Sequence, residues 1–163
     1  TLPDNHEMPE NLTIFTFVFT RCRDVCLAQT ESMKWLLDNL DENDSARVQI
    51  LSISLDPWHD SVSTMADFAS SKDADWPHLT SPDAGNMSKQ RYFDLESVWG
   101  AYGVSLETAP AEDGEDDFVI VHNQPIVLVD SQHRKRVSWD NAEFVPELFL
   151  EDVQTLLDDV GAE

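Results

Sequence analysis

An apolar run that leads directly into a pair of cysteines is the feature that most constrains this chain. Residues 12–19 are apolar and β-prone and lose any polar stripe toward their end, which predicts a strand buried on both faces. Residues 24–40 then carry apolar side chains at the three- and four-residue spacing of an amphipathic helix. Cys22 and Cys26 therefore fall where a buried strand passes into a helix.

This position favours chemistry at the two sulfurs. Amide groups and the dipole at the start of a helix stabilise a thiolate relative to a thiol, so redox chemistry or metal binding is our first hypothesis for Cys22 and Cys26. A structural disulfide and two inert buried thiols remain as alternatives, because C-x-x-x-C is less diagnostic than paired C-x-x-C motifs. Arg21 and Arg23 flank Cys22 and either stabilise thiolates or serve as surface charges.

The remaining pattern predicts one α/β domain over residues 1–163. An irregular lead-in is expected at 1–11, a loop at 38–45 and an acidic loop at 106–117. Further strands are expected at 48–55, 76–80, 118–122, 125–129 and 136–139. Further helices are expected at 61–71, from 83 or 86 to 101, and at 146–160. The early strands alternate with helices and the last two form a hairpin. This order predicts a thioredoxin-like sandwich, with a central mixed sheet flanked by helices.

The charge of the chain is strongly negative. Acidic residues number 32 and basic residues 10, which gives a net charge of −22. Such a surface repels nucleic acid and anionic lipid, so we expect neither as a partner. Self-repulsion at this charge is relieved by salt, because at ~1 M the Debye length falls to roughly 3 Å. We expect a salt-adapted, halophilic source, with an acidic mesophilic protein as the alternative.

The chain contains no run of 18 or more apolar residues, and residues 1–11 have neither a basic start nor an apolar segment. We therefore expect a soluble chain without a signal peptide or membrane span, which leaves open a segment removed before residue 1.

A histidine far along the chain completes a possible metal site. In a thioredoxin-like fold the loop after the first strand packs against the loop that enters the hairpin, which would bring His122 near Cys22 and Cys26. Two thiolates and an imidazole are a soft ligand set suited to copper, because thiolates select Cu(I) and imidazole also tolerates Cu(II). A structural zinc site would require a fourth protein ligand, and none is obvious.

The other histidines and methionines have weaker claims. His59 follows Asp56-Pro57, at the sheet end that carries Cys22, and is a candidate for an extra ligand or for a contact behind the ligands. His6, His78 and His133 are interpreted as surface or packing residues. The methionines Met33, Met65 and Met87 are predicted to lie in the core.

Three blocks of sequence, in order, resemble the Sco/SenC family of thioredoxin-like proteins that help to assemble the copper centre of cytochrome c oxidase. Residues 19–26, FTRCRDVC, are similar to the family's F-x-T-x-C-P-D-V-C. Residues 52–60, SISLDPWHD, are similar to S-V-D-P-x-x-D, and residues 117–122, DFVIVH, to D-Y-x-V-x-H. A C-x-x-x-C motif alone is weak evidence for this family, but the three blocks in this order are fairly specific to it.

The resemblance implies that Cys22, Cys26 and His122 match the copper ligands of the family. It also implies delivery of copper to a respiratory oxidase subunit, or to another copper or thiol protein. The expected location is the extracytoplasmic face of the cell membrane, with contact to the membrane only through an anchor absent from this chain. We expect a monomer.

Several positions depart from the family pattern. Arg23 and Leu27 replace the prolines usual around the second cysteine. Pro125 falls near the position of the cis-proline that faces the cysteines of thioredoxins, and its isomer is not readable from sequence. The family usually has a hairpin before the first strand, whereas only eleven residues precede Leu12 here.

The favoured function is therefore a copper-binding metallochaperone rather than an ordinary enzyme. The alternative is a thiol-disulfide oxidoreductase in which one of Cys22 and Cys26 attacks a partner and the other resolves the mixed disulfide. A peroxidase is third, since residues 19–25 lack the proline and hydroxyl arrangement expected around its reactive cysteine. A structural module is the remaining possibility.

Overall fold

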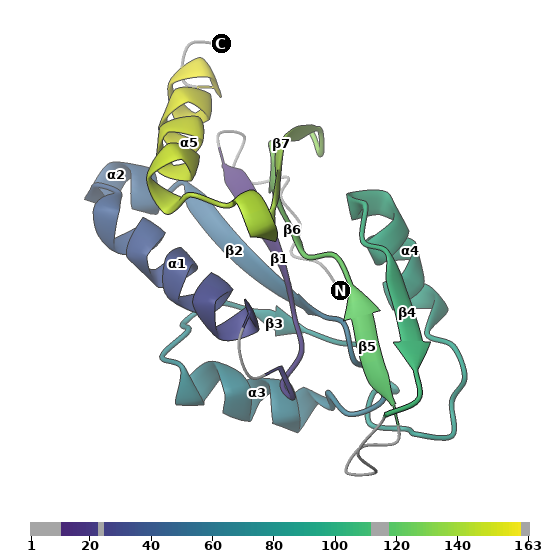
Figure 1. The fold of residues 1–163 in the computed structure, drawn as a ribbon. Helices are drawn as coiled ribbons and strands as arrows, with labels where there is room; N and C mark the ends of the chain where they lie inside the picture. Colours follow the sequence, from purple (N-terminus) through teal and green to yellow (C-terminus); the bar gives the residue numbers. More distant parts are fainter. Residues whose placement is uncertain (1–10, 23–24, 112–117, 161–163) are drawn as a thin grey trace.

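A five-stranded mixed sheet forms the centre of the protein, with helices on both of its faces (Figure 1). The computed structural model describes residues 11–22, 25–111 and 118–160. The strands are β1 (Leu12–Val18), β2 (Val48–Ser54), β3 (His78–Leu79), β4 (Leu106–Ala109), β5 (Val119–His122), β6 (Pro125–Val129) and β7 (Lys135–Asp140). The helices are α1 (Val25–Asn39), α2 (Glu42–Ser45), α3 (Val62–Ser71), α4 (Phe93–Tyr102) and α5 (Pro146–Val160).

The strand order β3-β2-β1-β6-β7 confirms the predicted topology. β1 pairs in parallel with β2, and β2 with β3, as expected for strands joined through helices. β6 pairs antiparallel with both β1 and β7, so the predicted late hairpin is present. β4 and β5 form a separate two-stranded antiparallel sheet.

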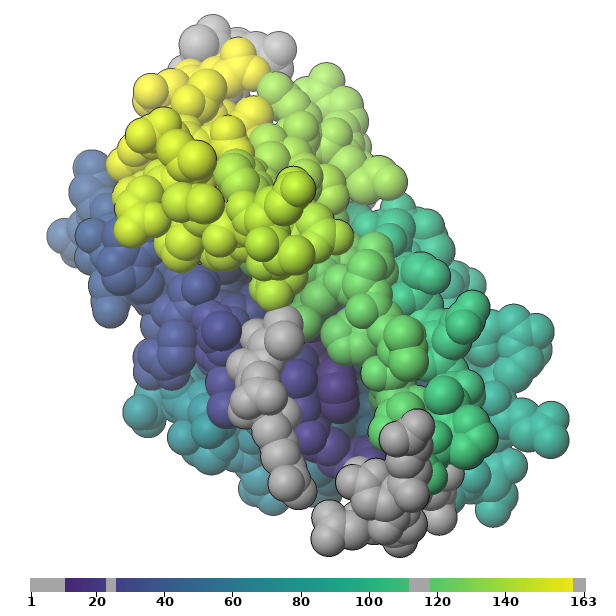
Figure 2. Space-filling view, viewed as in Figure 1, coloured from purple at the N-terminus to yellow at the C-terminus, as the bar shows by residue number. Residues whose placement is uncertain are grey.

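The central strand β1 is buried along its whole length, as its apolar run predicts. Leu12 and Ile14 pack with α1 and α5 on one face of the sheet, and Phe15 and Phe17 pack with α4 on the other. The alternation of strand side chains thus divides one strand between two cores. In Figure 2, part of the purple segment that contains β1 and the following loop reaches the surface between blue α1 and green β5.

Two segments differ from the sequence prediction. Leu106–Ala109, expected as the start of an acidic loop, is strand β4, because each of its residues pairs with β5. α4 begins at Phe93 rather than at residue 83 or 86, since the preceding segment turns at Gly85, which has a φ of +89°. Residues 112–117 of the expected loop, and residues 1–10 of the expected lead-in, lie outside the described residues.

Smaller details of the chain agree with the sequence analysis in part. The loop predicted at 38–45 contains the short helix α2, whose start is capped by the Asp41 side chain. Met87 is 43% exposed rather than part of the core, whereas Met33 and Met65 are buried as predicted. Pro125 has a trans peptide bond. None of the helices within residues 11–22, 25–111 and 118–160 combines the length and apolarity that crossing a bilayer requires.

Two leucines of α5 test the assignment of the core. Leu157 is 1% exposed in the core under α1, and Leu148 on the same helix is 46% exposed. We expect Leu157→Ala to lower the free energy of unfolding by about 2–5 kcal/mol, because it leaves a cavity. The matched control Leu148→Ala should change it by less than about 0.5 kcal/mol. Equal effects in denaturant titrations would contradict this packing.

Candidate metal centre

The two cysteines lie on either side of the start of α1. Cys22 is half-buried in the loop after β1 and Cys26 is fully buried in the first turn of the helix. The backbone N–H of Cys26 donates to the Cys22 sulfur at 3.3 Å, so an amide at the helix start points at this sulfur. The two cysteines are not joined in a disulfide. This geometry favours ionisation at Cys22, as the strand-to-helix position predicted.

Cys26 has the opposite environment. Its hydrogen bond with Cys22, its burial and the charge of Cys22 all raise the pKa of the Cys26 thiol. The pair is therefore asymmetric: Cys22 is half-buried and accepts an amide hydrogen bond, whereas Cys26 is fully buried and its pKa is raised.

A buried glutamine contacts Cys26 from the other side of the site. The Nε2 group of Gln124 lies 3.5 Å from the Cys26 sulfur and donates to the Phe17 carbonyl at 2.6 Å. Sequence analysis did not single out Gln124, because an isolated amide follows no motif. Its place at the entry to β6, the strand beside β1, is the one signal that could have indicated the contact.

His122 ends β5 and lies against the cysteine loop. Its ring makes an edge contact with Phe19, with centroids 5.4 Å apart, so the predicted approach of the two loops is present. The His122 Nδ1–H donates to the Asn123 carbonyl at 2.8 Å, which leaves the lone pair on Nε2. However, no three His, Cys, Asp or Glu side chains among the described residues lie together as a metal site. His122 thus lies beside the cysteine loop, and its joint ligation of a metal with Cys22 and Cys26 stays a prediction.

The cysteine loop is held to β2 by a buried carboxylate. Asp60 is 0% exposed, and its Oδ1 atom accepts hydrogen bonds from Thr20 N–H at 3.1 Å and from the Thr20 hydroxyl at 2.6 Å. The Ser54 hydroxyl donates to the other carboxylate oxygen at 2.7 Å. Burial raises the pKa of Asp60 to about 6, although these donors act in the opposite direction.

A second buried carboxylate, Asp56, fixes the residue beside Cys22. Arg21 donates to Asp56 at 2.8 Å, and the His59 ring binds the same carboxylate at 2.9 Å. The ring of Phe118 lies 5.6 Å from the Arg21 guanidinium and 5.4 Å from the His59 ring. His59 is thus placed behind the cysteine loop, as a partner of Asp56. Arg23 lies outside the described residues.

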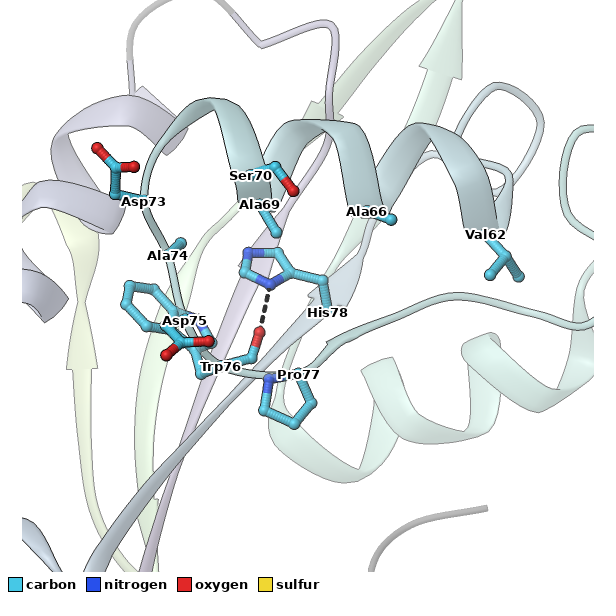
Figure 3. Close-up of a pocket in the computed structure, with 10 residues that line it drawn as sticks. All are labelled: Val62, Ala66, Ala69, Ser70, Asp73, Ala74, Asp75, Trp76, Pro77 and His78. Atoms are coloured by element: carbon cyan, nitrogen blue, oxygen red, sulfur yellow. Dashed lines mark hydrogen bonds between the residues drawn. The ribbon is translucent and has the colours of Figure 1, made fainter.

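A separate cavity lies away from the cysteines. It has a volume of about 700 Å³ between α3 and residues 73–78, and none of its lining residues belongs to the cysteine loop or to β5 (Figure 3). His78 lies on its wall, donates from Nδ1 to the Trp76 carbonyl at 2.8 Å and stacks on the Trp76 ring. Burial lowers the pKa of His78. This histidine is a packing residue, as predicted.

Comparison with known proteins gives one family. The sequence model described as SCO1/SenC matches residues 3–158. A search of curated proteins finds no match.

Three solved structures are similar over most of this chain. ScoI of Bradyrhizobium japonicum with copper bound is 24% identical, has a TM-score of 0.71, and matches 93% of this chain and 88% of its own. A SCO1/SenC family lipoprotein of Bacillus anthracis is 19% identical, with a TM-score of 0.66 and coverages of 92% and 83%. BsSco, described with a disulfide switch, is 23% identical, with a TM-score of 0.58 and coverages of 92% and 82%. These likenesses establish the fold.

The buried Asp60 carboxylate predicts a specific pH dependence of stability. A folded-state pKa of about 6, above the ordinary 3.8, means that the folded protein binds the proton more tightly than the unfolded chain. The stabilisation is complete below the unfolded pKa and is lost as pH rises through about 6, a change of about 3 kcal/mol. Asp60→Asn keeps an acceptor for Thr20 and does not titrate.

We therefore expect the unfolding free energy of Asp60→Asn, relative to the wild type, to rise by about 3 kcal/mol between about pH 3 and about pH 7. Urea titrations at a series of pH values measure this difference, and the other acids cancel because both proteins contain them. A difference that does not change with pH would show that Asp60 titrates normally.

Proposed function

This chain belongs to the SCO1/SenC family, and from that premise we propose that it is a copper metallochaperone. The proposed ligands are the thiolates of Cys22 and Cys26 and the Nε2 atom of His122. The observation that carries this proposal is the contact of the His122 ring with the loop that leads from β1 through Cys22 into α1, where the second cysteine, Cys26, lies in the first turn.

The residues present fit copper chemically. Thiolates are the ligands that Cu(I) prefers, and imidazole accepts both Cu(I) and Cu(II). The Nδ1–H bond from His122 to the Asn123 carbonyl matches the way in which metal-binding histidines are commonly oriented. Because His122 packs on Phe19, assembly of the site requires its side chain to turn toward the sulfurs.

The proposed recipient is the copper subunit of a respiratory oxidase. BsSco is described as a member of a family of cytochrome c oxidase assembly proteins, and the Bradyrhizobium relative has copper bound. The Bacillus anthracis relative is a lipoprotein, which supports a location for this chain at the extracytoplasmic face of the membrane. Copper is in this account the cargo that the protein carries to its partner.

Anaerobic titration tests the ligand set. We expect the wild type to bind one Cu(I) per chain, and Cys22→Ser and Cys26→Ser each to weaken the affinity by more than about 100-fold, because direct ligands contribute more than their outer-shell partners. His122→Ala should also weaken binding, whereas His133→Asn, in the turn before β7, should not. Wild-type affinity in both cysteine variants would contradict the proposal.

The asymmetry of the cysteines favours a second candidate function, thiol-disulfide exchange. The Cys22 thiolate would attack a partner disulfide and form a mixed disulfide, and the partner's second sulfur would leave as a thiolate. Cys26, after losing its proton, would then displace the partner. This transfers two electrons, so that the partner becomes a dithiol and the chain a disulfide. The disulfide switch described for BsSco is in line with this chemistry.

Metal-free turnover separates the two functions. If exchange is the function, the reduced chain should reduce a partner disulfide without copper, and Cys26→Ser should accumulate the mixed disulfide at Cys22. If copper transport is the function, the reduced chain kept free of copper by a chelator should show no appreciable turnover with a partner disulfide. Trapping of Cys22 by mass spectrometry in the Cys26→Ser variant measures the intermediate directly.

A further inference from the structure

A buried amide beside Cys26 has no part in the proposed ligand set. Gln124 is 4% exposed, and its Nε2 group donates to the Phe17 carbonyl at 2.6 Å and to Gln29 Oε1 at 3.1 Å. The same nitrogen lies 3.5 Å from the Cys26 sulfur, within hydrogen-bond distance for a sulfur acceptor. One Nε2 hydrogen binds the Phe17 carbonyl, so the second serves the two remaining acceptors, Gln29 Oε1 and the Cys26 sulfur.

The backbone of β1 fixes which end of this amide faces the sulfur. The Phe17 carbonyl can only accept a hydrogen bond, so at 2.6 Å it must face the nitrogen of Gln124 and not the oxygen. Turning the amide over would bring two oxygens together and would direct the amide oxygen at Cys26. The donor at the sulfur is therefore a consequence of strand geometry.

The arrangement is costly in the metal-free protein. Three acceptors surround a nitrogen with two hydrogens, and Gln124 Oε1 and Gln29 Nε2 have no partner among the described residues. An apolar pair of similar size would avoid these unsatisfied groups. A charged sulfur at Cys26 offsets part of the cost, because hydrogen bonds to charged acceptors are stronger than those to neutral ones.

We propose that Gln124 is a positioning residue for copper, whose Nε2 group holds the Cys26 sulfur and stabilises its charged, metal-bound form. This inference rests on the proposed function. Gln29, 1% exposed on α1, acts through Gln124 by fixing its amide. Because Gln124 follows His122 by two residues, the same contact ties the histidine segment to α1.

Copper binding by Gln124→Met tests the role, because methionine has a similar length and no donor. We expect one Cu(I) per chain with roughly 10- to 100-fold lower affinity, the range typical of outer-shell partners, and a shifted thiolate-to-Cu(II) charge-transfer band. Gln29→Met should cause a smaller loss in the same direction. The control Gln49→Met removes an amide that binds Thr13, at the opposite end of β1, and should change neither property. Wild-type affinity and spectrum in Gln124→Met would overturn the proposal.

A metal-free readout separates this inference from the proposed function. In a Cys22→Ser background, the ultraviolet absorbance of the Cys26 thiolate is followed against pH. Gln124→Met should require a higher pH to form the thiolate, because it removes the amide donor that lies 3.5 Å from the sulfur. Gln124→Glu, which places an oxygen against the sulfur, should require a still higher pH. A wild type without stoichiometric copper defeats the proposed function, whereas identical thiolate titrations defeat the role of Gln124.

Discussion

The candidate site depends on two carboxylates that are buried at the turn after β2. Asp60 holds Thr20 through both the backbone N–H and the hydroxyl, and Asp56 holds Arg21. The loop that carries Cys22 has left the β1 ladder, so these side-chain bonds replace the strand pairing that positions the residues before it. Buried charge is unfavourable unless it is paired or hydrogen-bonded, and here both conditions are met by the cysteine loop itself.

The other part of the site, residues 122–124, lies where the chain passes from the small sheet to the main sheet. β5 pairs with β4 in the small sheet, and β6 pairs with β1 in the main one, so residues 122–124 lie at the passage between the two. This passage places His122 against Phe19 and Gln124 against Cys26. Two segments distant in sequence, the turn after β2 and residues 122–124, thereby contact the region of the two cysteines. The chemistry proposed for the pair depends on both contacts: one supplies a candidate ligand, and the other a donor.

Much of the fold could be predicted, because apolar residues recur in the sequence with the period of the buried strand or helix face. The continuous apolar run of β1 and the late hairpin were recognisable, and the Asp56-Pro57 pair marked the end of β2. Strand β4 was not recognised, because its middle residues, Glu107 and Thr108, are exposed and its only partner is the neighbouring strand β5.

The site was less predictable than the fold. Asp60 belongs to the block 52–60 that resembles the family, but nothing in the sequence distinguishes this buried acid from the other acidic residues among the 32. Gln124 carried no signal, because its importance depends on the Phe17 carbonyl and the Cys26 sulfur, which only the folded chain brings to it. The three candidate ligands followed from the expected thioredoxin-like fold and from resemblance to a family, and their joint coordination of copper stays a prediction.

The central claim is that Cys22, Cys26 and His122 together bind copper. X-ray absorption spectroscopy of the Cu(I)-loaded protein tests it most directly, because sulfur and imidazole nitrogen scatter differently. The account predicts two sulfur ligands and one imidazole, with the imidazole signal absent in His122→Ala. A wild-type spectrum with sulfur ligands alone, or one that is unchanged in His122→Ala, would contradict it.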